Sequence, residues 1–255
     1  AYADAEVSPT LAKLTKNPDY RLFDILYNSL PDTHKQILTT QYRMIENIGN
    51  LISKVFYRGI IDTGCNDDEK RHGLNRYVGK SIVWFDTSAN KKKSQKRTKG
   101  GSYINEEEKR IILEILDDLK STGELKGLDI GIITGYSGQK ELLRKSIKAT
   151  GLDKIASRID INTLDAFQGR ENDIIIYSTV RTRDSIGFQK EKERVNVAFS
   201  RAKKLLIVCG DKNFFYNFDD QDNKFVEIID YISEGEECEI IQCDGGKLFE
   251  RESNS

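Results

Sequence analysis

Short apolar runs that alternate with helical patterns constrain the fold of this chain more than any other feature. The strand-like segments lie at 81–86, 128–134, 157–162, 173–180 and 205–210, and all but 157–162 are centred on an apolar run. Continuous apolar character indicates strands that are buried on both faces, and parallel strands need a crossover, usually a helix, between them. The sequence therefore predicts an α/β fold with a doubly wound, mainly parallel sheet flanked by helices. Because such folds bind ligands outside the carboxyl ends of their strands, we expect the site there.

The remaining elements are predicted from helical spacing and from turn residues. Helical patterns cover 20–30, 44–57, 103–119 and 211–232, another helix ends near 149, a first short strand is expected at 36–40 and an edge strand at 239–242. We expect an extended lead-in over 1–19 and one domain over 20–243, with 58–101 as a possible protruding loop or small insertion. A flexible tail is expected over 244–255.

Composition limits the functional classes. At 255 residues and 38% hydrophobic, the chain can bury a full core. A net charge of −1 argues against a protein that coats nucleic acid by bulk electrostatics, so any such contact must be local. No apolar run reaches the roughly 18 to 20 residues that cross a bilayer, and no signal pattern opens the sequence, so we expect no membrane partner and a cytoplasmic or other reducing compartment. The four cysteines lack metal-ligand spacing, which favours free thiols and no metal site.

The stretch 193–203, just before the apolar run at 205–210, carries the most chemistry. On a helix, Arg194, Val197 and Arg201 would share one stripe and point two guanidiniums in the same direction. A neighbouring apolar stripe is expected at Val195, Phe199 and Ala202. Because a guanidinium stays charged and donates several hydrogen bonds, the two arginines are candidates to grip a phosphate. The alternative is an ordinary amphipathic helix with a solvated basic face.

Two further stretches favour the functional interpretation. Gln41-Tyr42-Arg43-Met44 stands near the start, and 162–173 reads NTLDAFQGREND before an apolar strand. Together with 193–203, in this order and spacing across about 170 residues, they resemble motifs IV, V and VI of superfamily 1 helicases, most closely the Upf-like branch. The resemblance implies a RecA-like motor domain, the second and C-terminal one of a pair. It makes 1–19 the linker from a first motor domain.

The resemblance also implies a nucleotide site. Tyr42 would stack on the adenine of ATP, while Arg43 and Arg201 would reach its γ-phosphate as arginine fingers do. Glu171 would lie toward the ribose. The predicted catalytic residues are therefore Arg43 and Arg201, and the predicted nucleotide contacts are Tyr42, Gln168, Gly169, Glu171 and Arg194.

A surface for single-stranded nucleic acid is implied in the same way. Thr163 would touch the nucleic-acid backbone, and Gln168 with Gly169 would line the joint between the strand and the nucleotide. The segment 135–139, GYSGQ, resembles a family segment that lies along the strand, although Gly135 stands where the family commonly has proline. An ordinary strand-to-helix turn is an equal alternative for this segment. The predicted strand contacts are Thr134, Tyr136, Gln139 and Thr163.

A P-loop-like sequence at 73–81 is rejected as a phosphate site. Five residues separate Gly73 from Gly79 where the motif has four, and the residues that follow predict a strand rather than the helix that a P-loop must open. No apolar strand ending in Asp-Glu precedes the three motifs. We therefore expect ATP to bind with Mg²⁺ whose ligands belong to the absent first motor domain.

The basic run 91–101 is the one clear cluster of like charge. A mobile, solvated loop is the favoured interpretation, and a salt-sensitive, sequence-blind contact with nucleic acid is the alternative.

These observations predict the C-terminal motor domain of an ATP-dependent helicase or translocase that acts on single-stranded DNA or RNA. Its partners would be that strand and the first RecA-like domain of the same protein. By itself, the chain should hydrolyse ATP poorly. Two alternatives remain: a non-catalytic module that binds nucleic acid or protein on a RecA-like fold, and a nucleotide-binding regulator that does not translocate.

Overall fold

The computed structural model describes residues 27, 29–36, 38–124, 127–152, 159–167 and 169–249. The chain divides into two compact units, 1–38 and 39–255. In the first unit, a short 3-10 helix covers Asp32–His34. The predicted linker at 1–19 and most of the predicted helix at 20–30 lie outside the described residues.

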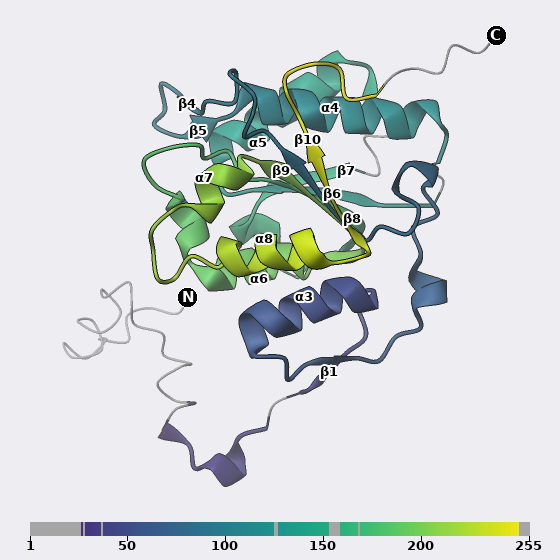
Figure 1. Ribbon diagram of the computed structural model, residues 1–255, viewed down its shortest axis with the longest axis vertical. Helices are drawn as coiled ribbons and strands as arrows, with labels where there is room; N and C mark the ends of the chain where they lie inside the picture. The colour runs from purple at the N-terminus through teal and green to yellow at the C-terminus, as the bar shows by residue number, and fades with distance from the viewer. Residues whose placement is uncertain are drawn as a thin grey trace, which may run out of the picture. The chain divides into compact units, whose positions relative to one another are not determined.

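The second unit is built around a six-stranded sheet in the order β10-β3-β9-β8-β6-β7 (Figure 1). Every neighbouring pair of strands in this sheet is parallel. The strands are β3 (Ile82–Asp86), β6 (Ile130–Thr134), β7 (Ile159–Thr163), β8 (Asn172–Ser178), β9 (Ala202–Gly210) and β10 (Cys238–Gln242). The predicted doubly wound RecA-like α/β fold is confirmed, with β10 at the edge as expected.

Helices cover both faces of the sheet (Figure 1). On one face lie α4 (Glu106–Ser121) and α5 (Ser137–Ala149). On the other lie α3 (Glu46–Tyr57), α6 (Lys192–Phe199) and α8 (Phe225–Glu234). Because both faces are covered, the central strands are apolar on both sides, which explains their continuous apolar runs.

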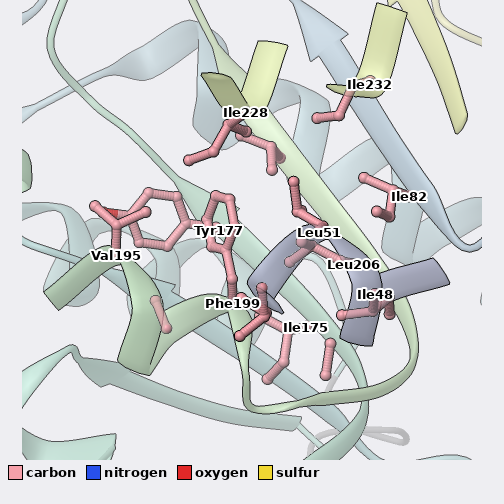
Figure 2. Packing of buried hydrophobic residues seen from close by; sticks show 14 of the residues in the cluster. Ile48, Leu51, Ile82, Ile175, Tyr177, Val195, Phe199, Leu206, Ile228 and Ile232 are labelled. Atoms are coloured by element: carbon pink, nitrogen blue, oxygen red, sulfur yellow. The ribbon is translucent and has the colours of Figure 1, made fainter. Parts of the chain in front are cut away.

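The core on the α3, α6 and α8 face interlocks residues from all three helices with the sheet (Figure 2). Leu51 of α3, Phe199 of α6 and Ile228 of α8 are fully buried against strand residues such as Leu206. Apolar burial of this kind stabilises a fold by about 25 cal/mol for each Å² removed from water. The three helices are therefore fixed to the sheet, and the loops at their ends are held in place.

Several predicted boundaries are wrong for local reasons. Helix α4 begins at Glu106 rather than at 103, because the Asn105 side chain accepts hydrogen bonds from the N–H groups of Glu107 and Glu108 and caps it. The helix predicted over 211–232 is two helices, α7 (Lys212–Tyr216) and α8. The chain turns between them where the Asn223 amide donates to two carbonyl groups, those of Phe215 and Phe218.

The segment 58–101 is not one protruding loop. It contains β3 of the main sheet and two short 3-10 helices, Asp67–Lys70 and Asn75–Tyr77. It also contains β2 (Asp62–Thr63), which pairs in parallel with β1 (Thr40–Gln41) as a separate two-stranded sheet. The first short strand was expected at 36–40, so it begins later than predicted and lies outside the main sheet.

The packed chain also extends past residue 243, where the tail was predicted to begin. Leu248 and Phe249 pack against the core beneath α4, and the Phe249 ring meets Phe85 edge to face at 6.3 Å between ring centroids. Residues 250–255 lie outside the described part of the chain. Among the helices that the structure describes, none has the length and apolar character needed to span a membrane.

Candidate functional site

Gln41 shapes the loop that presents Tyr42 and Arg43. Its side-chain oxygen accepts hydrogen bonds from the N–H groups of Arg43 at 2.9 Å and Met44 at 2.8 Å. Its amide donates to the Met44 carbonyl and, at 2.7 Å, to the Thr63 hydroxyl on β2. One glutamine therefore ties the loop to itself and to the small β1–β2 sheet, which fixes the direction of the Arg43 side chain.

The segment 62–70 forms the base beneath this loop. Lys70 Nζ donates to the carbonyl groups of Tyr42 and Arg43, each at 2.6 Å. Gly64 lies against the Tyr42 ring, since a Cβ there would stand 2.4 Å from Cε1 of the tyrosine. The ring remains 68% exposed. A supported aromatic face that is open to solvent suits stacking on a flat ligand.

The Arg43 guanidinium reaches two distant segments of the chain. Its Nε donates to Glu171 Oε2 at 2.6 Å, and its Nη1 donates to the Ser200 carbonyl at 3.3 Å. The hydrogen bond from Arg43 lowers the pKa of Glu171, with a smaller contribution from the charge of Lys203. Glu171 is therefore a carboxylate that holds Arg43 in one orientation.

Arg201 lies in the turn after α6 and not on the helix. Its Nε donates to the Val197 carbonyl at 3.2 Å, and its Nη1 donates to the Arg170 carbonyl at 3.3 Å. Burial, and then the charge of Arg43, lowers the pKa of Arg201. Within the described residues no carboxylate forms an ion pair with Arg201, and Glu171, whose charge acts on it, is already paired with Arg43. Such an excess of positive charge favours an anion.

Arg194 does not join this cluster. It lies in the first turn of α6, where it pairs with Glu191 at 2.8 Å and Asp165 at 3.4 Å and stands over the Phe188 ring. Helix α6 ends between Arg194 and Arg201, so the helical repeat does not align the two side chains. The predicted stripe of Arg194, Val197 and Arg201 is thus wrong, because the helix ends at Phe199. The predicted apolar stripe of Val195, Phe199 and Ala202 is fully buried.

Gly169 has a conformational reason to be glycine. Its φ is 86°, which strains any residue with a Cβ, and a Cβ built there would meet nothing within 4 Å. The close approach of another chain segment, which would also require glycine, is not observed within the described residues. Gln168, the other residue predicted for this joint, lies outside them.

The cluster stands at the amino ends of the strands, contrary to the expected carboxyl ends. Glu171 directly precedes β8 and Arg201 directly precedes β9, and the first residues of these strands, Asn172 and Ala202, are paired. The segment between β7 and β8 returns across the sheet through one short 3-10 helix, Asp165–Phe167, and buries Phe167 against Gly131. Because of this return, Thr163 and Glu171 of the stretch 162–173 lie at opposite edges of the sheet.

The predicted strand contacts lie at the carboxyl ends of β6 and β7, and most are buried. Thr134 and Gln139 are fully buried and Tyr136 is 4% exposed. The Gln139 amide bonds to both backbone groups of Asn105 and to the Ser178 hydroxyl. These three side chains support the fold, and their burial does not support direct contact with a ligand. Thr163, partly exposed at the end of β7, is paired with Thr134.

Other residues at the site were not found from the sequence. Lys70 and Gly64 lie in a polar stretch whose pattern gives no signal for a role beside Tyr42. The carboxyl group of Glu108, on the amphipathic helix α4, was likewise missed. It is fully buried and accepts hydrogen bonds from the Ser178 and Thr179 hydroxyls and the Val180 N–H, all at the carboxyl end of β8.

A groove of about 820 Å³ runs along α4, and none of the predicted site residues lines it. The four cysteines are free thiols. Among the described residues, no group of three or more histidine, cysteine, aspartate or glutamate side chains is placed to hold a metal ion.

Comparisons with known proteins agree with the geometry. A family model described as an AAA domain matches residues 19–213. An uncharacterized ATP-dependent helicase of Methanocaldococcus jannaschii is 31% identical over 91% of this chain and 34% of its own length. Helicase SEN1 of Saccharomyces cerevisiae is 36% identical over 68% of this chain and 8% of its own. A regulator of nonsense transcripts 1 homolog of Neurospora crassa is 32% identical over 68% of this chain and 16% of its own.

The chain belongs to the Upf-like branch of the superfamily 1 helicases. It spans about a third or less of the length of these helicase relatives. A solved C-terminal domain of a possible DNA helicase from Lactobacillus plantarum has a TM-score of 0.40 at 14% identity over 67% of this chain and 88% of that chain. The strand order and parallel pairing of the six-stranded sheet themselves show the RecA-like fold of this helicase domain.

Proposed function

We propose that this domain is the second motor domain of an ATP-dependent helicase or translocase and supplies Arg43 and Arg201 to the γ-phosphate of ATP. The observation that carries the proposal is the convergence of Arg43, Glu171 and Arg201 from three segments far apart in sequence. A first RecA-like domain of the same protein would complete the nucleotide site, and single-stranded DNA or RNA would be the second ligand.

The chemistry of the two arginines supports this role. A guanidinium has five N–H donors. Arg201 directs two of its nitrogens to carbonyl oxygens, which fixes its position and leaves other N–H groups for phosphate oxygens. Arg43 is held in the same way by Glu171 and Ser200. Positively charged donors fixed before the reaction stabilise the charge that develops on a transferred phosphoryl group.

Tyr42 and the open surroundings of the cluster support a nucleotide shared between two domains. The exposed Tyr42 ring lies on the same short loop as Arg43 and would stack on the adenine. Glu171 would lie toward the ribose and hold the Arg43 guanidinium in place by its hydrogen bond. The Mg²⁺ that accompanies ATP would be held by the first domain and would neutralise phosphate charge there.

Substitution of the two arginines in the longest natural chain that contains this domain tests the proposal. Arg201→Ala should lower strand-stimulated ATP turnover by about 10³-fold or more, and Arg43→Ala should also lower it strongly, because each removes a charge from the γ-phosphate. Arg71→Ala is the matched control, since Arg71 is exposed and pairs only with Asp68. Folding is compared by circular dichroism.

Near-normal turnover in Arg201→Ala would contradict the assignment of that residue. If the natural chain neither binds nor hydrolyses ATP, the motor proposal fails as a whole, and a non-catalytic module that binds nucleic acid or protein becomes the better explanation. Activity in the longer chain, together with little activity in the 255-residue chain, is the expected result.

A further inference from the structure

Three aromatic rings form a row at the carboxyl edge of the sheet. Tyr103 and Tyr136 meet with their ring centroids 5.6 Å apart, and Tyr136 and Phe188 are separated by the same distance. Tyr136 is buried, whereas Phe188 is 49% exposed. Phe188 is therefore supported by Tyr136 and flanked by the Arg194 guanidinium, 5.2 Å from its ring centroid, while half of the residue stays open to solvent. It provides a stacking face for a planar group.

Basic side chains lie beside Tyr103, at the end of this row away from Phe188. The strands β4 (Lys96–Arg97) and β5 (Tyr103–Ile104) form a hairpin in which Arg97 is paired with Tyr103. Arg97 and Lys99 are exposed, and no described carboxylate pairs with either. The chain as a whole carries a net charge of −1, so this positive charge is local to the hairpin.

The hairpin is fastened to the body of the domain. Gln95 and Thr182 are joined by reciprocal hydrogen bonds, in which the N–H of each donates to the side chain of the other, at 3.2 and 2.9 Å. A Cβ at Gly138, in the first turn of α5, would stand 3.1 Å from both Thr98 and the Tyr103 carbonyl. The segment 91–101, expected as a mobile, solvated loop, therefore contains a strand and fixed contacts, while most of its lysines are exposed to solvent. Cations on a fixed support lose less entropy on binding than cations on a free loop.

We propose that Phe188, Arg97 and Lys99 form a contact surface for single-stranded nucleic acid. An unpaired base stacks on the Phe188 ring, while neighbouring phosphates meet Arg97 and Lys99. The proposal rests on the proposed motor function and names the residues that contact the strand in place of the buried Thr134, Tyr136 and Gln139. An unpaired base can stack on an exposed aromatic ring, which Phe188 supplies. Phosphates bind best to cations that have no carboxylate partner, and Arg97 and Lys99 have none among the described residues.

Other lysines of the basic run are excluded from this surface. Lys92 and Lys96 line the groove along α4 together with Glu106 and Glu107. Those carboxylates would repel a phosphate, so the two lysines receive no strand contact. Lys93 is already paired with Asp211 at 2.8 Å.

The test measures the affinity of the longest natural chain for fluorescent oligo-dT and oligo-U of about 12 nucleotides, by anisotropy over a series of salt concentrations. Phe188→Ala should weaken binding by about tenfold or more, and Phe188→Leu, which keeps apolar bulk but loses the ring, should weaken it nearly as much. Arg97→Gln combined with Lys99→Gln should lower the slope of log K against log salt by about 1.4, which is twice the value of about 0.7 for each phosphate.

Lys145→Gln combined with Lys148→Gln is the matched control. It removes the same charge from the exposed side of α5, away from the hairpin, and should leave the salt slope within about 0.3 of wild type. An equal fall in slope in the control would show only a general charge effect and would overturn the inference. Unchanged affinity in both Phe188 variants would also overturn it.

Failure of this inference and failure of the motor proposal give different results. If the wild-type chain hydrolyses ATP and binds the strand while all variants bind equally well, the contact surface lies elsewhere and the motor proposal stands. If the wild-type chain binds no single strand at all, the proposed function itself fails. Binding of an acidic protein in place of oligonucleotide would assign the cations to another partner and would reject the nucleic-acid surface.

Discussion

The carboxyl group of Glu108 links the stability of the fold to pH. It is fully buried, and burial raises its pKa from 4.5 to about 8, although hydrogen bonds from Ser178, Val180 and Thr179 lower it in part. Because the folded state holds this proton more tightly than the unfolded chain, it binds more protons between the two pKa values. The contribution of Glu108 to stability is therefore full below pH 4.5 and is lost progressively as the pH rises toward 8.

The two pKa values set the size of the effect. One unit of pKa is worth about 1.4 kcal/mol, so the free energy of unfolding should lose about 4 kcal/mol from this group between pH 5 and pH 9. In Glu108→Gln, the amide can donate to the Ser178 hydroxyl and accept from the Val180 N–H, so the packing is kept while the titration is removed. Relative to wild type, the variant should gain about 4 kcal/mol over this range of pH.

Urea unfolding of both proteins at pH 5, 7 and 9, followed by circular dichroism, measures this difference. Subtracting wild type from variant at each pH cancels the other groups that titrate. Glu227→Gln on the exposed side of α8 is the control and should give a constant difference. A difference for Glu108→Gln that does not change with pH, or that falls, would refute the reasoning. It would mean that the hydrogen bonds to the carboxylate outweigh its burial.

Two further substitutions test residues that hold the two edges of the sheet in place: Gly64 beneath the Tyr42 ring and Asn105 at the start of α4. In Gly64→Ala, the new Cβ would stand 2.4 Å from the Tyr42 ring, so the ring must move. The KM for ATP of the longest natural chain should therefore rise by about tenfold. Gly100→Ala, with open space around the new Cβ, should leave KM unchanged, and equal effects of the two variants would contradict the role of Gly64. Asn105→Ala removes the cap of α4 and the hydrogen bonds to the carbonyl groups of Lys93 and Val180. The free energy of unfolding in urea should therefore fall by about 2 to 4 kcal/mol. A fall of less than about 0.5 kcal/mol would contradict this role of Asn105.

The main sheet was predictable because its strands are buried on both faces. The centres of these strands, such as 174–177 and 205–209, stay apolar throughout, which few other structures require. The small β1–β2 sheet was not predictable in this way, since its two-residue strands bury no apolar face. The break within 211–232 depends on the hydrogen bonds of a single asparagine, which periodicity does not reveal.

The candidate site was predicted in part. The resemblance of three motifs anticipated that Arg43, Glu171 and Arg201 belong together, and the structure brings them into one cluster. Spacing along the chain could not show which edge of the sheet they occupy, because the return between β7 and β8 contains only the three-residue 3-10 helix Asp165–Phe167, too short for a periodic pattern to reveal. Nor could spacing separate a buried support such as Gln139 from an exposed side chain such as Phe188, because the burial of each depends on segments distant in sequence.

The nucleotide candidates and the proposed strand surface lie near opposite ends of β8. Glu171 directly precedes this strand, and Arg181, whose guanidinium stands 4.2 Å from the Tyr103 ring centroid, follows its end. All seven residues of β8 are buried, and β6 and β9 bond to it on either side, so about 23 Å of strand connects the two edges without a flexible joint. A phosphate that draws Arg43 and Arg201 toward a first domain would therefore carry the Phe188 surface with it. Under the proposed function, the domain steps along the strand as a rigid body, and no change inside the sheet is required.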